Sequence, residues 1–175
     1  MAQVPVPVNE AVLGYGPGSK ERTKLESALG KMAGADPIEL TATIAGVSKP
    51  AGGDPFDVTM PSDHSHILGH AANATRADAT EAIDAALVAS PEWAELGFEQ
   101  RAAVFLRAAD LLAGPWRDTL NAATMLGQGK TVQQAEIDAA CELIDFWRFN
   151  VAFARHIFDD QPISSPGIWN RTAYR

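Results

Sequence analysis

The sequence predicts a mostly α-helical chain with a small antiparallel strand pair or meander and an unfinished C-terminal strand. Three observations lead to this prediction. Apolar residues recur at helical spacing between residues 75 and 158, apolar and polar residues alternate in two stretches between residues 38 and 60, and a turn-rich segment precedes a last alternating stretch, Ile168 to Arg175. Strands and helices do not alternate along the chain, so the pattern gives no evidence of a complete parallel sheet.

Composition places the chain among globular proteins and disfavours two classes of partner. It is 46% apolar and 21% charged, and it lacks the run of about 18 apolar residues that a membrane-spanning helix needs. The net charge of −8 disfavours binding to nucleic acid or to anionic membranes. The single cysteine, Cys141, excludes an internal disulfide, and MAQVPVPVNE resembles no targeting signal. We therefore expect a cytoplasmic, bacterial protein.

Residues 1–37 are predicted to form an extended N-terminal arm followed by a short helix. The first 18 residues contain three prolines and three glycines, a composition typical of an arm that must lean on another part of the molecule. Ser19 can cap the helix, Glu21 suits the positive end of its dipole, and Gly34 ends it.

Residues 38–74 are predicted to form the β-strand region. Ile38 to Ile44 alternates strictly and indicates one half-buried strand, Phe56 to Met60 indicates a second, and His66 to Ala71 indicates a third. The nearby histidines, His64 among them, have no supporting cysteine or carboxylate cluster, so we expect no metal site.

Residues 75–160 are predicted to be helical and residues 161–175 to form an exit turn and a strand. Thr75 with Asp78 resembles a capping box, and Pro91 is expected to stop the helix that follows. A second helix begins near Phe98 and closes at Gly114, and a third ends near Gly129.

The last and longest predicted helix runs without a break from about Thr131 to Phe158. At roughly 100° per residue, its apolar residues form two adjoining stripes: Val132, Ala135, Ala139, Leu143, Phe146, Phe153 and Ile157 in one, and Ile137, Ala140, Ile144, Trp147, Val151 and Ala154 in the other. Glu136 and Asn150 fall inside this apolar arc. Because buried polar groups require partners, we expect both to satisfy backbone groups or neighbouring side chains.

An acidic row borders the apolar arc of the same helix. Asp138, Glu142 and Asp145 face roughly one way and should repel one another by a few tenths of a kcal/mol per pair. Two interpretations stay open: a solvated network with Arg148 and Arg155, favoured by base rates, or a site that receives a ligand ammonium group.

Two other features invite a catalytic interpretation and are better explained structurally. Gly127 to Thr131 ends like a phosphate-binding loop, but position 124 is Thr124 instead of glycine and no strand precedes it. We interpret it as a helix break. Cys141 lies in mid-helix with no histidine within two turns, so we interpret it as a small buried apolar residue.

The run GQGKTVQQAEIDAACELIDFWRFNVAFA, with QPISS and NRTAYR after it, resembles the L-glutamate-γ-semialdehyde dehydrogenases. These enzymes, also called Δ1-pyrroline-5-carboxylate dehydrogenases, are the proline-catabolic branch of the aldehyde dehydrogenase superfamily. The resemblance extends through PVNEAVLGYGPGS and HILGHAANATRADATEAIDAAL, and thus covers nearly the whole chain. It implies an incomplete α/β aldehyde dehydrogenase-like fold, corresponding to the N-terminal third of such an enzyme.

The resemblance also implies an activity, a cofactor and one site residue. The activity is the NAD-dependent oxidation of a small aldehyde, glutamate γ-semialdehyde, to L-glutamate. The family's catalytic cysteine, its glutamate base and its NAD loops match no position of this chain, which is therefore expected to be inactive alone. Glu142 matches the position that lies near the substrate's α-amino group. Residues 75–160 would be the helical part of the cofactor-binding domain.

The expected partners are the remainder of the same enzyme and further copies of it, since RTAYR resembles the first strand of the family's oligomerisation flap. The alternative is a noncatalytic helical interaction module derived from such an enzyme. That module would pair its unfinished strand and its apolar surfaces with a partner.

Overall fold

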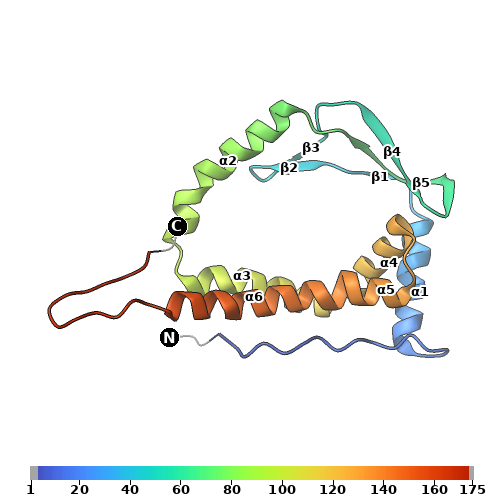
Figure 1. Cartoon of the computed structure of the whole chain (residues 1–175). Coiled ribbons are helices and arrows are strands. Elements are labelled where there is room, and N and C mark those ends of the chain that lie inside the picture. The colour runs from blue at the N-terminus through green and yellow to red at the C-terminus, as the bar shows by residue number, and fades with distance from the viewer. Residues whose placement is uncertain (1–3, 174–175) are drawn as a thin grey trace.

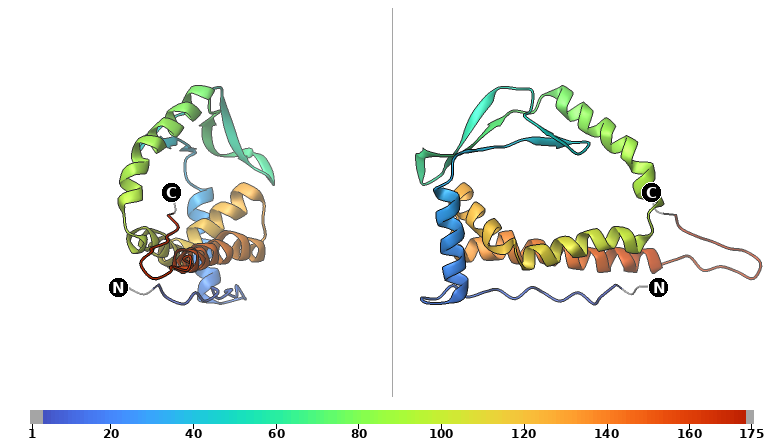
Figure 2. Two further views of the ribbon diagram at one scale, coloured as in Figure 1. Left: turned by 60° about the vertical axis from the view of Figure 1, so that its left-hand side comes forward. Right: turned by 180° about the vertical axis from the view of Figure 1, so that it is seen from behind.

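The computed structural model describes residues 4–173, and the predicted class, mostly helices with small antiparallel strand pairs, is confirmed. Figure 1 shows the helices α3, α4 and α6 gathered into one cluster, while the strands and α2 arch away from it; the views in Figure 2 agree. No helix within residues 4–173 has the length and apolar character needed to cross a membrane.

The first helix, α1 (Lys20–Ala33), has the bounds that its sequence predicts. The Ser19 hydroxyl accepts a hydrogen bond from the backbone N–H of Arg22, and Gly34 is the C-cap. Leu25 is its buried residue, and α1 packs against α4. A local cap and one apolar contact surface thus fix this helix.

The strand region contains two small sheets. In the first, β5 (Asp63–Ala72) pairs antiparallel with β4 (Pro55–Met60) and parallel with β1 (Ile38–Glu39). In the second, β2 (Ala42–Ile44) pairs antiparallel with β3 (Val47–Lys49). The turn between them has positive φ at Ala45 and Gly46, as a two-residue hairpin loop requires.

The prediction of one strand from Ile38 to Ile44 is wrong, because the chain changes sheets within it. The backbone N–H of Leu40 still donates to the carbonyl of His70, at 2.8 Å, and the next strand, β2, belongs to the other sheet. Alternation predicts extended backbone correctly but carries no information about which strand each half pairs with.

Helix α2 (Arg76–Glu95) runs through Pro91, so the predicted stop there is wrong. Proline removes one N–H and leaves the carbonyl four residues earlier without its partner. That residue, Leu87, is 65% exposed, so water can solvate its carbonyl. The predicted capping box is confirmed, because Thr75 and Asp78 exchange hydrogen bonds at the start of the helix.

The core lies where α3 (Phe98–Ala113) packs along α6 (Glu142–Asp159). Its buried members are Ala109, Leu112, Ala140 and Ile144, with Ala113, Leu120, Leu143 and Trp147 packed around them. Helix α4 (Arg117–Gln128) closes one end of this cluster and ends at Gly129, which has φ 65°.

The predicted helix from Thr131 to Phe158 is present but is not one continuous α-helix. It consists of α5 (Val132–Ala135), a π-helix η1 (Glu136–Cys141) and α6. A π segment inserts an extra residue and so rotates the following residues by about 100°. The first predicted stripe is accordingly buried at Ala135 but more than half exposed at Phe146, Phe153 and Ile157.

The C-terminal strand predicted from Ile168 is absent over residues 168–173, and residues 174–175 lie outside the described part of the chain. A strand needs a hydrogen-bonding neighbour, and here side chains replace it. The backbone N–H of Asn170 donates to the Ser164 hydroxyl at 2.9 Å, and that of Thr172 donates to Gln161 at 3.0 Å. Figure 1 shows this segment projecting beyond the end of α6.

Candidate functional site

Glu142 stands at the junction of the π-helix and α6. Its backbone N–H donates to the carbonyl of Ile137, the last bond of the π type. The residue is exposed, and its carboxylate has no hydrogen bond or ion pair within residues 4–173. The side chain identified by resemblance is therefore free to receive a cation.

The other two acids of the row are already paired. Asp138 accepts from Lys130 at 2.6 Å. Asp145 accepts from the Asn9 side chain at 2.6 Å and from the backbone N–H of Glu10 at 2.7 Å. Glu142 is thus the member of the row whose carboxylate has no partner in the described structure.

The network predicted between the acidic row and two arginines is wrong. Arg148 pairs with Glu10 at 2.7 Å, and Arg155 pairs with Glu99 at 3.2 Å and with Asp159 at 3.3 Å. All three acids lie outside the row. Long side chains select partners in space, which the angular position on one helix cannot reveal.

A buried polar cluster lies beside the start of the π-helix, and we call it the Glu136 cluster. Its centre, Glu136, is fully buried. The carboxylate accepts from the backbone N–H of Leu13 at 2.7 Å, from the Tyr15 hydroxyl at 2.8 Å, from the Asn121 amide at 2.8 Å and from the guanidinium of Arg117. The prediction that Glu136 satisfies backbone and neighbouring groups is confirmed.

The protonation states of the Glu136 cluster follow from these contacts. Burial alone would raise the pKa of Glu136, but the hydrogen bonds from Arg117, Leu13 and Tyr15 outweigh burial and hold it below its ordinary value. Burial and the neighbouring carboxylate raise the pKa of Tyr15. At neutral pH the cluster therefore holds an ionised Glu136 beside a neutral phenol.

Arg117 joins the cluster to the N-terminal arm. Its guanidinium donates to Glu10 at 2.6 Å and to the carbonyl of Ala11 at 2.8 Å, besides its bonds to Glu136. Burial would lower the pKa of Arg117, but the hydrogen bonds with Glu136 and Glu10 raise it. The sequence pattern missed Arg117, although a buried glutamate predicts a nearby cation as its partner.

Cys141 is buried beside the same cluster, as predicted. Its sulfur lies 3.3 Å from Nη2 of Arg117. Burial first, and then the Glu136 carboxylate, raise the pKa of the Cys141 thiol to about 11. The thiol is therefore protonated at neutral pH, which opposes a role as a nucleophile.

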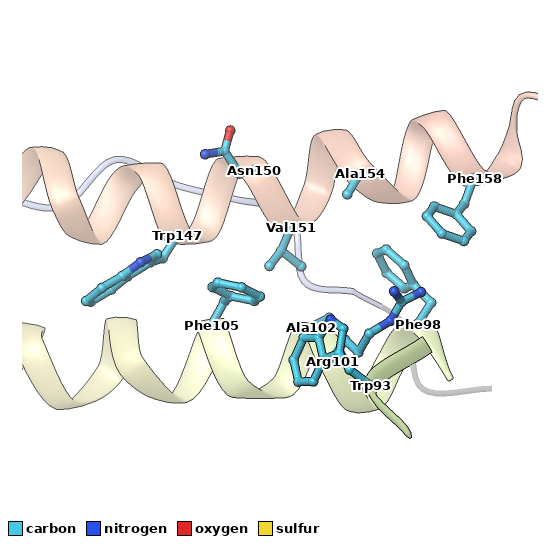
Figure 3. Close-up of a pocket in the computed structure, with 10 residues that line it drawn as sticks. All are labelled: Trp93, Phe98, Arg101, Ala102, Phe105, Trp147, Asn150, Val151, Ala154 and Phe158. Atoms are coloured by element: carbon cyan, nitrogen blue, oxygen red, sulfur yellow. The ribbon is translucent and has the colours of Figure 1, made fainter. Parts of the chain in front are cut away.

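Asn150 differs from its prediction, because it is exposed at the rim of an apolar pocket. Figure 3 shows this pocket between α3 and α6, with aromatic side chains facing one another across it. The lining residues are Trp93, Phe98, Arg101, Ala102, Phe105, Trp147, Asn150, Val151, Ala154 and Phe158. The rotation introduced by η1 explains why Asn150 leaves the buried side.

The glycine-rich segment before η1 is a helix break, as predicted. The N–H of Gly129 closes α4 by donating to Met125, and the Thr131 hydroxyl caps α5 by accepting from Gln134. Helices, and not a strand, precede and follow it, so this segment is not the strand–loop–helix cradle of a dinucleotide site. Nor do residues 4–173 contain three His, Cys, Asp or Glu side chains placed to hold a metal ion.

Comparison with known proteins identifies similar chains over nearly the whole length. The model of the "Aldehyde dehydrogenase family" matches residues 48–175. Delta-1-pyrroline-5-carboxylate dehydrogenase of Agaricus bisporus is 42% identical over 99% of this chain and 32% of its own length. The human mitochondrial protein of the same name is 43% identical over 95% of this chain and 29% of its own length.

Solved structures give the same result. The Delta-pyrroline-5-carboxylate dehydrogenase of Mycobacterium tuberculosis, bound with NAD and cobalamin, is 58% identical with a TM-score of 0.96, over 100% of this chain and 33% of that one. A Thermus thermophilus 1-pyrroline-5-carboxylate dehydrogenase mutant is 26% identical with a TM-score of 0.82, over 95% of this chain and 32% of its own. The chain thus spans about a third of the length of these relatives.

Proposed function

This chain belongs to the aldehyde dehydrogenase family, and from that premise we propose that it forms part of an NAD-dependent L-glutamate-γ-semialdehyde dehydrogenase. The observation that carries the proposal is the 58% identity and TM-score of 0.96 over the entire chain to the solved Delta-pyrroline-5-carboxylate dehydrogenase of Mycobacterium tuberculosis. The enzyme would oxidise the aldehyde carbon of glutamate γ-semialdehyde to a carboxylate and so produce L-glutamate.

This segment would contribute to substrate recognition, and the chemical step would take place elsewhere in the enzyme. NAD is proposed as the cofactor because the M. tuberculosis structures are described as bound with it. The glycine-rich segment before η1 lies between two helices and is not a dinucleotide loop, and Cys141 is buried with a raised pKa. We therefore assign neither the nucleophile nor the cofactor contacts to this segment.

Glu142 is proposed to bind the α-ammonium group of the substrate. Its exposed carboxylate is unpaired within residues 4–173, whereas both neighbouring acids of the row are paired. An ammonium group offers three donors and a full positive charge, so a carboxylate is its natural partner. Such a contact would distinguish this substrate from simple aldehydes of similar length.

The test is Glu142→Ala in the full-length enzyme. Losing a charge-assisted hydrogen bond of about 1.5–3 kcal/mol should lower kcat/KM for glutamate semialdehyde by roughly ten- to a hundred-fold. A simple aldehyde without an amino group should be oxidised at an unchanged rate. Asp138→Ala is the matched control, because Asp138 is an exposed acid of the adjoining η1 that already pairs with Lys130. Equal losses on both substrates would contradict the proposal.

The partners follow from the same proposal. The remainder of the enzyme would cover the exposed apolar faces of this segment, and residues 161–175 would begin the flap that joins copies of the enzyme. The division at residues 37, 74 and 160 and the cytoplasmic location stay predictions; several relatives are named as mitochondrial. The alternative is a noncatalytic interaction module. Binding of the 175-residue chain to a partner other than the rest of the enzyme would favour that alternative.

A further inference from the structure

The direction of the Glu142 side chain depends on the form of the helix before it. Residues Glu136–Cys141 are wound as a π-helix, and the N–H of Glu142 bonds to Ile137 instead of Asp138. If this segment relaxed to an α-helix, it would accommodate one residue fewer. Glu142 would then turn by about 100° about the helix axis. The π form therefore determines where the carboxylate of Glu142 points.

Two anchors bracket the π-helix, and both involve the N-terminal arm. At its first residue, Glu136 accepts from Leu13 and Tyr15 of the arm as well as from Arg117 and Asn121 of α4. After it, Asp145 accepts from Asn9 and from the N–H of Glu10.

The arm connects these two anchors through Arg117 and Glu10. Glu10 receives hydrogen bonds from Arg117 of α4 and from Arg148 of α6, at 2.6 and 2.7 Å. One extended segment, residues 9–15, thus contacts the helix on each side of the π turn and the neighbouring helix. Contacts at two fixed points set both the rotation and the rise of the chain between them.

We propose that the N-terminal arm holds η1 in its π form and thereby aims Glu142 at the substrate, with Glu136 as the main positioning residue. π segments are rare and are frequent at functional sites, so a specific set of contacts must stabilise this one. The Glu136 cluster and the Asp145 contacts are that set. This inference rests on the proposed function of Glu142.

The test uses two mild variants of the arm in the full-length enzyme, Tyr15→Phe and Asn9→Ala. Tyr15 is half-buried and Asn9 makes an exposed contact, so each change removes hydrogen bonds without creating a buried charge. Each should raise KM for glutamate semialdehyde by about fivefold, the equivalent of one hydrogen bond, and leave kcat unchanged. A simple aldehyde should show no change.

A stronger variant, Glu136→Gln, should lose more selectivity but no more than Glu142→Ala. If the arm acts only through Glu142, adding Tyr15→Phe to Glu142→Ala should cause no further loss for glutamate semialdehyde. Lys49→Ala, which removes an exposed ion pair with Glu81 far from the arm, is the control and should retain full selectivity. Unchanged KM in both mild variants would overturn the inference.

Crystal structures of the arm variants test the role of the arm independently of the proposed function of Glu142. In Tyr15→Phe or Asn9→Ala, the backbone N–H of Glu142 should donate to the carbonyl of Asp138 instead of that of Ile137 in part of the molecules. If Glu142→Ala fails to discriminate between substrates, the proposed function fails, and these structures still decide whether the arm sets the helix form. A π-helix unchanged in both variants would contradict the arm's role.

Discussion

Helices α6 and α2 are both long and carry apolar residues at helical spacing, yet their surroundings are opposite. Helix α6 buries Ile144, Val151 and Ala152, while α2 has no buried residue and exposes Ile83, Leu87 and Val88 by 60% or more. Both helical runs begin at a capping box, Thr75 with Asp78 for α2 and Thr131 with Gln134 for the run that η1 and α6 complete. Helix formation by local hydrogen bonds and helix stabilisation by burial are therefore separable in this molecule.

The difference also indicates where contacts outside this chain belong. An apolar helix face without a cover is unusual in a stable protein, and the relatives of this chain are about three times as long. This chain covers one face of α6, the face with Ile144 and Val151, and leaves Phe146, Phe153 and Ile157 more than half exposed. Under the proposed function, another segment of the enzyme would cover the exposed apolar face of α2.

Glu136→Ala should produce the largest loss of stability. It acts on the buried part of the molecule next to α6, and not on the exposed helix α2. It leaves Arg117 buried without its main partner, which should lower the free energy of unfolding by about 3–5 kcal/mol. Urea unfolding of the 175-residue chain measures this change. The control, Glu81→Ala, breaks the exposed pair with Lys49 and should cost at most about 1 kcal/mol. Similar losses in both variants would show that the cluster is not a stabilising centre.

Ile144→Ala and Ile83→Ala test the comparison directly with the same substitution. Ile144 is fully buried, so its truncation should cost about 2–5 kcal/mol, whereas Ile83 is 60% exposed and should cost under about 0.5 kcal/mol. Urea unfolding of the 175-residue chain gives both values. In the full-length enzyme Ile83→Ala should become distinctly more costly, and an unchanged small cost there would mean that nothing covers α2.

A smaller effect than those of Glu136→Ala and Ile144→Ala concerns the capping box at the start of α2. Thr75→Ala should cost about 1 kcal/mol, seen as hydrogen exchange about fivefold faster in the first turn of α2.

The same capping box predicts a pH dependence. Hydrogen bonds from Thr75 and from the N–H of Gly52 lower the pKa of Asp78 from 3.8 to about 2. The contribution of this carboxylate is thus complete above about pH 4 and is lost as pH falls toward 2. The protection factors of the α2 amides, which correct for the intrinsic pH dependence of exchange, should fall over that range, and in an Asp78→Ala chain they should not.

Local chemistry was predictable from the sequence, whereas long-range pairing was not. The caps Ser19 and Thr75 and the helix break at Gly129 depend on neighbours within a few residues, so their patterns are visible in the sequence. Glu136 was recognised as buried, but its partners Tyr15 and Arg117 lie 121 and 19 residues away along the chain. No periodicity connects such positions.

The errors have one physical cause in common, which is that a pattern assumes regular geometry. The π turn shifted Phe146 and Asn150 out of the predicted buried arc because a constant angle per residue was assumed. The predicted helix stop at Pro91 was wrong because a helix can tolerate one lost hydrogen bond where water solvates the free carbonyl. The predicted strand from Ile168 was wrong because an alternating segment without a hydrogen-bonding neighbour does not become a strand.

The contacts of the N-terminal arm also dictate the order in which the molecule can assemble during synthesis. Leu13 and Glu136 are separated by 123 residues, and Asn9 and Asp145 by 136. The arm is synthesised before α4 and α6, yet its binding surface does not exist until α6 has been translated. Contacts of such large sequence separation form slowly, so the arm reaches its native position later than the helices that it contacts.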